Sequence, residues 1–373
     1  MRAHLKCREV KQVLDVHGTE RAYEVLMTAF GPLEKVKDKS SDYFMLTKGL
    51  YLYCEGEILW RNGDLKKALE CLESSLEFFK ALPKEHTDLA RCYNAIGNCY
   101  SSLKLLEKAL EFYNKAYMTQ KKVAGSEHHF DIPIYKNQIG TVYVGLGDYK
   151  KATKCYEDAL SLLKELNLLG SWDEAHFLRN LANAYIHRKE YKKATGPADR
   201  AYNIRMKILE NHPLTVQSIY QRAVIQSYLN EDERSLQLLL EAWKMEKALD
   251  AGNHSPVWRD IIVGVETSYD NLGKRNQKRG FRKEALKFCE HLWEERKGSK
   301  LFCFDDLDKE VIDTILELLS KKKGKYIVYK VEKEQFQKMY SAKKEEFQEK
   351  ADQIQRILHH SGKSHWHCKL FLN

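Results

Sequence analysis

Residues 137–160 read NQIGTVYVGLGDYKKATKCYEDAL and hold three small residues among large side chains, Gly140, Ala152 and Ala159. Counted from Gly140, which we call the anchor, Tyr143 lies at +3, Ala152 at +12, Tyr156 at +16 and Ala159 at +19. Positions 0 and +3 share one face of a first helix, and positions +12, +16 and +19 share one face of a second. The stretch therefore predicts a helix hairpin whose two helices cross closely at the small residues.

The same pattern returns along the chain at a nearly constant interval. Other copies begin at the anchors Gly56, Gly97, Ala182, Ala223 and Gly273. The first five anchors are 41 to 43 residues apart, and the gap of 50 residues before Gly273 predicts an insertion. Self-similarity at such a period is the sequence signature of stacked repeats. We predict an all-α fold, a right-handed α-solenoid of helix hairpins.

These residues resemble a known family, the tetratricopeptide repeat. The small anchor, the aromatic residue three positions on, the alanine of GDYKKA (147–152) and the pair Tyr156 and Ala159 are similar to its signature. A period of about 42 residues rather than 34 resembles the subgroup of kinesin light chain and nephrocystin. The longer period allows about one more turn in each helix. The resemblance implies a concave inner face, lined by the first helices, that binds proteins or peptides.

Histidines recur in the loops before the first helices. His86, His129 and His212 each lie 11 residues before an anchor, and His254 lies in the corresponding loop of the last copy. The light-chain subgroup has a similar His-Pro loop. Because successive loops lie one repeat apart, we interpret these histidines as helix-capping or packing residues rather than metal ligands.

The pattern divides the chain into three parts. Residues 1–40 read as an N-terminal helix pair or a diverged repeat, with the turn in DVHGTE. Residues 41–298 are expected to form the tetratricopeptide repeat array of about six repeats, in which GPA at 196–198 interrupts a second helix and predicts a kink or an early start there. Residues 299–373 are expected to form C-terminal capping helices and a basic tail.

Composition and charge restrict the class of protein. The chain has 373 residues, 6 of them proline, and 43% are hydrophobic, which favours a helical globular protein. Its nine cysteines include no CxxC pair, which favours a reducing compartment, and we predict a cytoplasmic protein without a membrane span. The net charge of +9 is concentrated in residues 321–373, which carry 13 Lys and Arg against 6 Asp and Glu. We therefore predict no nucleic-acid partner, although contact of this basic tail with an anionic surface is an alternative.

Motifs for catalysis are lacking in the sequence. There is no phosphate-binding GxxxxGK[ST], no strand-linked GxGxxG and no GxSxG. His359, His360, His365, His367 and Cys368 gather near the C-terminus, but their spacing is unlike that of zinc sites. The sequence predicts no enzyme, no cofactor and no metal.

The candidate binding residues lie on the first helices, near each anchor. Asparagine is a mediocre helix former, but its amide can pair with the main chain of a bound peptide. The alternative is that Asn98, Asn183 and Asn271 bond across neighbouring helices. The predicted partner-binding set is Arg91, Asn94, Asn98, Asn137, Gln138, Thr141, Arg179, Asn180, Asn183, His187, Asp270, Asn271 and Lys274.

We predict a non-catalytic scaffold, adaptor or sensor that binds a protein or an extended peptide on its concave face. The cationic residues Arg91, Arg179 and Lys274 give a mild expectation of an acidic ligand. An alternative is a peptide-sensing signalling regulator of the bacterial quorum-sensing repeat type. The sequence leaves the oligomeric state open.

Overall fold

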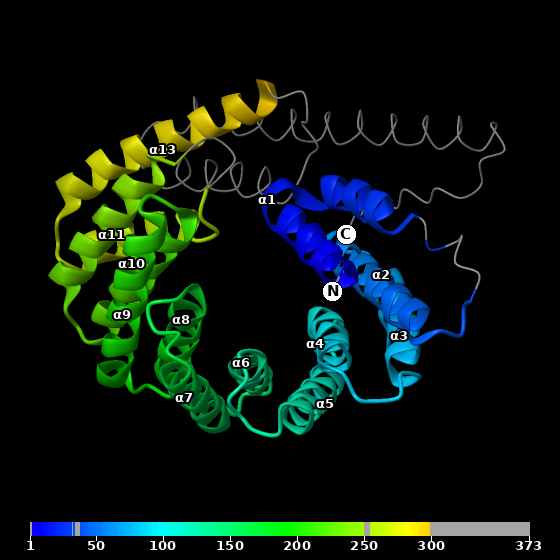
Figure 1. Cartoon of the computed structure of the whole chain (residues 1–373). Helices are drawn as coiled ribbons and strands as arrows, with labels where there is room; N and C mark the ends of the chain where they lie inside the picture. The colour runs from blue at the N-terminus through cyan, green and yellow to red at the C-terminus, as the bar shows by residue number, and fades with distance from the viewer. Residues whose placement is uncertain (1, 32, 34–37, 250–253, 299–373) are drawn as a thin grey trace. The chain divides into compact units, whose positions relative to one another are not determined.

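The computed structural model describes residues 2–31, 33, 38–249 and 254–298, and every regular element in these ranges is helical (Figure 1). The prediction of an all-α solenoid is confirmed. The chain divides into two compact units, residues 1–210 (unit 1) and 211–373 (unit 2). The expected capping helices and basic tail at 299–373, with the terminal histidine cluster, lie outside the described residues.

Unit 1 is a series of helix hairpins that follows one long N-terminal element. Its helices are α1 (Arg2–Phe30), α2 (Asp42–Arg61), α3 (Leu65–Lys80), α4 (Thr87–Ser102), α5 (Leu106–Ala124), α6 (Asp131–Gly145), α7 (Tyr149–Glu165), α8 (Trp172–His187) and α9 (Tyr191–Leu209). Helices α4, α6 and α8 lie on the inner side of unit 1, with α5, α7 and α9 outside them (Figure 1). We call the side formed by the first helices the inner face.

The close crossing predicted at the anchors is present. A Cβ built on Gly97 would lie 2.7 Å from the ring of Tyr113, and one on Gly140 would lie 2.7 Å from the ring of Tyr156. The tyrosine at +16 therefore covers the glycine of the partner helix. Ala109, Ala152 and Ala194, at +12, are fully buried, as the sequence pattern requires.

The tyrosines at +3 pack between consecutive hairpins. Tyr100 packs against both the core cluster of α1–α4 and the cluster around Ala109 and Tyr113. Tyr143 likewise packs against the clusters of two consecutive hairpins. These rings join one hairpin to the next, because each hairpin alone leaves an apolar face that only its neighbour can cover.

The described residues of unit 2 form two more hairpins. They consist of α10 (Pro213–Tyr228), α11 (Asp232–Glu246), α12 (Trp258–Asn271) and α13 (Arg275–Gly298). At the crossing of α10 with α11 the anchor Ala223 is fully buried, and its carbonyl accepts a hydrogen bond from Ser235 Oγ at 3.0 Å.

The turns correct the register of the last repeat. In each hairpin the residue seven positions after the anchor has a left-handed backbone, with φ between 60° and 83°: Gly63, Lys104, Gly147, Lys189, Asn230 and Gly273. Gly273 is thus the turn residue, and the anchor of the sixth repeat is Glu266. The expected insertion before the sixth anchor was wrong, because glycine serves both close packing and left-handed turns and the two uses look alike in sequence.

An ion pair occupies the crossing of this sixth repeat. Arg282 lies 16 residues after Glu266, where the tyrosine lies in other copies, and its Nε donates to Glu266 Oε1 at 2.5 Å. Both side chains are largely buried, with exposed fractions of 7% for Glu266 and 15% for Arg282. A charge pair therefore replaces the glycine–tyrosine contact.

Two further expectations about helix breaks have opposite outcomes. The predicted turn in DVHGTE is present, because α1 bends at Gly18, whose φ of 80° and ψ of −175° are non-helical. The expected interruption at 196–198 is absent, since α9 runs unbroken from Tyr191 to Leu209 with Pro197 inside it. Packing of the buried Ala194, Ala198 and Ala201 outweighs the loss of one helical hydrogen bond.

Candidate functional site

Amide side chains connect the first helices across the inner face of unit 1. Asn180 Nδ2 on α8 donates to Asn137 Oδ1 on α6 at 3.1 Å, and both side chains are buried. Gln138 Nε2 on α6 lies 3.5 Å from Asn98 Oδ1 on α4, which also accepts from Tyr113 Oη at 2.8 Å. These bonds link α4, α6 and α8 in sequence.

Other predicted residues on these helices keep part of their surface available. Asn94 is half-buried, and its Oδ1 is a buried acceptor without a hydrogen-bond partner among the described residues. Thr141 is exposed, and its hydroxyl lies 3.2 Å from Tyr156 Oη. His187 is exposed and stacks on Tyr149, with ring centroids 4.7 Å apart. Asn183 is half-buried on α8.

Two arginine side chains lie near each other where α8 packs against α9. Arg179 on α8 is half-buried, and Arg205 on α9 is 2% exposed. Burial and the nearby charge of Arg179 lower the pKa of Arg205 to about 10. Burial, together with both arginines, lowers the pKa of His176 to about 4. The region is positively charged and poorly solvated, which favours a negatively charged ligand group.

The predicted residues of unit 2 are engaged in ion pairs and hydrogen bonds between helices. Asp270 pairs with Lys278 of α13. Asn271 Nδ2 donates to Asp232 Oδ1 of α11 at 3.2 Å, and Lys274 Nζ lies 3.7 Å from Glu233 Oε1. Asn98 and Asn271 therefore do bond across neighbouring helices, which was the alternative to partner binding.

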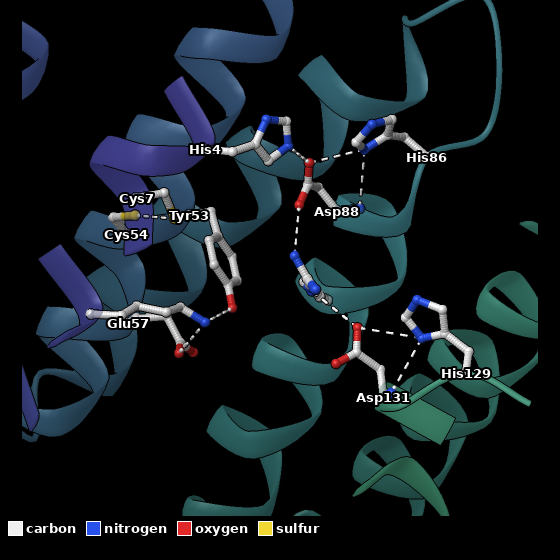
Figure 2. A network of polar contacts seen from close by, with 11 residues as sticks. His4, Cys7, Tyr53, Cys54, Glu57, His86, Asp88, His129 and Asp131 are labelled. Carbon is white, nitrogen blue, oxygen red and sulfur yellow. Dashed lines mark hydrogen bonds and ion pairs between the residues drawn. The ribbon is translucent and has the colours of Figure 1, made fainter. Parts of the chain in front are cut away.

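A polar network connects α1, α4 and α6 at the N-terminal ends of the first helices (Figure 2). His86 Nδ1 accepts from the Asp88 backbone N–H at 3.3 Å, and His129 Nδ1 accepts from that of Asp131 at 3.2 Å. His212 in unit 2 caps α10 in the same way, with 3.1 Å to the Leu214 N–H. The prediction of capping histidines is confirmed for these three loops. His254 differs, because its Nδ1 lies 3.0 Å from Glu246 Oε1.

Asp88 is the centre of this network. Its Oδ2 lies 2.7 Å from His4 Nε2 and 2.9 Å from His86 Nδ1, while its Oδ1 lies 3.4 Å from Arg91 Nη1. Although burial opposes the charged form, the hydrogen bonds of His86 and His4 hold the pKa of Asp88 below its ordinary value. The hydrogen bond with Asp88 raises the pKa of His86, and protonation turns Nδ1 from an acceptor of the Asp88 N–H into a donor to Asp88 Oδ2.

Arg91 connects this network to the next repeat. Its Nε donates to Asp131 Oδ2 at 3.1 Å, so the guanidinium bridges the first turns of α4 and α6. Nearby, Lys11 Nζ on α1 donates to Tyr53 Oη at 2.6 Å and lies 3.6 Å from Glu57 Oε2 on α2. Arg91, predicted as a binding residue, is thus also a link between repeats.

The sequence interpretation missed His4. The ligand atoms of His4, His86 and Asp88 all lie within 4.8 Å of one another, and imidazole and carboxylate are zinc ligands. Nothing in the repeat pattern indicated that α1 would bring a second imidazole to this loop, because His4 lies outside the repeated positions. Hydrogen bonding accounts for this arrangement, and the absence of a metal remains a prediction.

The inner-face geometry is that of a repeat array, and comparison with known proteins decides the family. The family model of the tetratricopeptide repeat matches residues 50–122 and 131–207. These residues carry tetratricopeptide repeats. Assignment to the subgroup with about 42 residues per repeat stays a prediction.

Solved structures of similar fold have low sequence identity to this chain. The apo form of the quorum sensor NprR from B. thuringiensis has a TM-score of 0.56 at 18% identity, over 90% of this chain and 86% of that one. BtubC (BKLC) from P. vanneervenii has 0.55 at 19% identity, over 62% and 91%. The apo form of RapI has 0.54 at 13% identity, over 86% and 98%. At these identities the likeness concerns the fold.

Within the described part of the tetratricopeptide chain, no helix is both long enough and apolar enough to cross a membrane.

Proposed function

We propose that the protein binds an extended protein or peptide segment along the inner face of α4, α6 and α8, and that it acts as a scaffold, adaptor or sensor without catalysis. The observation that carries the proposal is the row of amide side chains on these helices. Asn137 and Asn180 fix the spacing of α6 and α8, and Asn94 and Asn98 lie on α4 along the same row. Asn94 is half-buried and its Oδ1 has no hydrogen-bond partner among the described residues, so its amide would turn to accept a main-chain N–H of the ligand.

The buried cations beside this row support an acidic residue or a terminal carboxylate in the ligand. Burial lowers the pKa of both Arg179 and Arg205, and the charge of Arg179 lowers the pKa of Arg205 further, so a bound carboxylate would stabilise cations that burial disfavours. Arg91 contributes less to such recognition, because Asp88 and Asp131 already pair with it.

The cytoplasm is the compartment we propose. The described cysteines are free thiols, and most of them are buried in the helical core. Buried thiols of this kind persist in a reducing environment.

A binding experiment tests the inner face. Partners captured from source cells by the wild-type protein would be compared with those captured by N94A and R179E, with K192E as a control on the exposed side of α9. We expect N94A and R179E to lose the same specific partner and K192E to retain it. Circular dichroism would verify that helicity is unchanged. Retention of the partner by R179E would contradict the assignment of the inner face.

A loss measured for R179E alone would be ambiguous, because a reversed charge at a half-buried position can disturb the fold. N94A resolves this, since it removes a side chain whose Oδ1 has no described partner. Loss of a charge-assisted hydrogen bond typically costs about 1.5–3 kcal/mol, so R179E should weaken affinity roughly tenfold or more.

The second candidate is a peptide-sensing regulator. Its support is the fold similarity to the quorum sensor NprR, which extends over 90% of this chain. A sensor would bind a free peptide of a few residues with the same affinity as the longer protein segment that contains it. An adaptor would need flanking residues, so truncation of the captured partner separates the two.

A further inference from the structure

Two buried thiols from different helices touch where α1 packs on α2. Cys7 and Cys54 are 47 positions apart in sequence, yet their Sγ atoms lie 2.8 Å apart (Figure 2). Their exposed fractions are 7% for Cys7 and 1% for Cys54, and both are free thiols. A disulfide between helices needs side chains that already meet, and this pair fulfils that condition.

The surroundings favour reaction at Cys7. Lys11 lies one turn further along α1, and the polar side chains of Tyr53 and Glu57 hold its ammonium group beside the thiols. The hydrogen bond from Cys54 lowers the pKa of Cys7 against the effect of burial, and the charge of Lys11 adds to the lowering. Cys7 is also the more exposed of the two, so a small oxidant reaches it first.

The neighbouring cysteines lack this chemistry. Cys92 Sγ donates to the Leu72 carbonyl at 3.2 Å, and burial raises its pKa to about 12. Burial also raises the pKa of Cys99 to about 12. Thiols of this kind stay protonated and react slowly.

We propose that Cys7 and Cys54 form a reversible disulfide when the protein meets a peroxide. The Cys7 thiolate attacks the peroxide, its sulfur takes one oxygen to become a sulfenic acid, and hydroxide leaves in the case of hydrogen peroxide. The hydrogen bond and charge of Cys7, together with burial, raise the pKa of Cys54, and the first two causes end once Cys7 is an uncharged sulfenic acid. The Cys54 thiol then attacks that sulfur, the S–O bond breaks, and the oxygen leaves as water with the thiol proton. Two electrons pass from the thiol pair to the peroxide, and a dithiol reductant returns them.

The disulfide would fasten the first part of α1 to α2. This part of α1 carries His4, which reaches the Asp88 network of α4, and it ends at the bend of Gly18. Without the bond, α1 is held by non-covalent contacts alone. Oxidation would therefore fix the helix segment whose His4 contacts Asp88 at the start of α4.

Peptide mapping of the full chain tests the inference. Cys303 and Cys368 lie outside the described residues, so a C303S/C368S background excludes cross-links through them. After brief treatment with hydrogen peroxide and alkylation of free thiols, we expect one dominant cross-linked pair, Cys7 with Cys54, which dithiothreitol reverses. The oxidised protein should melt at a higher temperature than the reduced protein.

C54S and C92S are matched variants at buried cysteines of neighbouring helices. C54S should lose the cross-link and the rise in melting temperature, and Cys7 should instead accumulate as sulfenic acid. C92S should keep both. Alkylation of Cys7 and Cys54 in the peroxide-treated parent protein, or dominant cross-links between other cysteines, would overturn the inference. This result needs only the parent protein, so poor folding of a variant leaves the test intact.

Discussion

The substitution Gly140→Ala tests the close crossing on which the repeat rests. The new Cβ would lie 2.7 Å and 2.9 Å from two ring carbons of Tyr156, closer than real Cβ atoms approach. Tyr156 is 2% exposed, and its hydroxyl meets Thr141, so the ring has little room to move. Overpacking costs about 1–3 kcal/mol, and the better helix propensity of alanine returns about 1 kcal/mol. We expect a net loss of up to about 2 kcal/mol.

Gly280→Ala is the matched control, because a Cβ on Gly280 meets nothing within 4 Å and the residue lies inside α13. This variant should gain up to about 1 kcal/mol from helix propensity alone. Urea denaturation of both variants, followed by circular dichroism, measures the difference. If Gly140→Ala stabilises the protein as Gly280→Ala does, the helices do not cross as closely as described. Tyr156→Leu should not remove the penalty, because a Cβ on the equivalent Gly56 would lie 2.6 Å from Leu72 Cγ.

Three other perturbations have defined outcomes. Glu266→Ala should cost about 1.5–3 kcal/mol in a denaturation experiment, because it removes a charge-assisted hydrogen bond between two largely buried side chains; a cost below 1 kcal/mol, as for an exposed pair, would refute the buried-crossing account. The ion pair of His86 and Asp88 should stabilise the fold most near pH 5–6. The pKa of His86 is raised in the folded protein, so the stabilisation by His86 is lost as the pH rises through that pKa. The pKa of Asp88 is lowered, so the stabilisation by Asp88 is lost in acid. His86→Ala should flatten this stability profile between pH 6 and 8, and an unchanged slope would contradict the assignment. Pro197→Ala should raise the melting temperature by restoring a helical hydrogen bond within α9, and a lower melting temperature would show that the proline ring packs favourably.

The sequence predicted the hairpins because small residues at a crossing cannot be replaced by large ones without cost. Five anchors and the break at Gly18 could therefore be found from spacing and turn residues alone. The sixth anchor could not, because Glu266 and Arg282 fill the same space by charge pairing, which no pattern of residue size reveals.

The site was predicted less completely, and for a physical reason. Positions on the inner face follow from helical spacing, but spacing does not tell which amides bond to each other. Asn137 and Asn180 meet across two helices, whereas Asn94 keeps an acceptor without a described partner. The contacts of His4 and Cys7 could not be predicted, because the packing of α1 depends on the surface of α2 rather than on any repeated position.

The left-handed residue in each hairpin turn has a consequence for how such a chain can grow or shrink. These residues recur at intervals of 41 to 43 positions, and each turn is closed by its own backbone bonds, as from the Leu105 N–H to the Tyr100 carbonyl. A deletion from one turn to the next would remove one whole repeat, which we call a module, and would join two equivalent turns. A deletion of another length would rotate the following helix about its axis and turn charged side chains into the core. Viable length variants of this protein should therefore differ by entire modules.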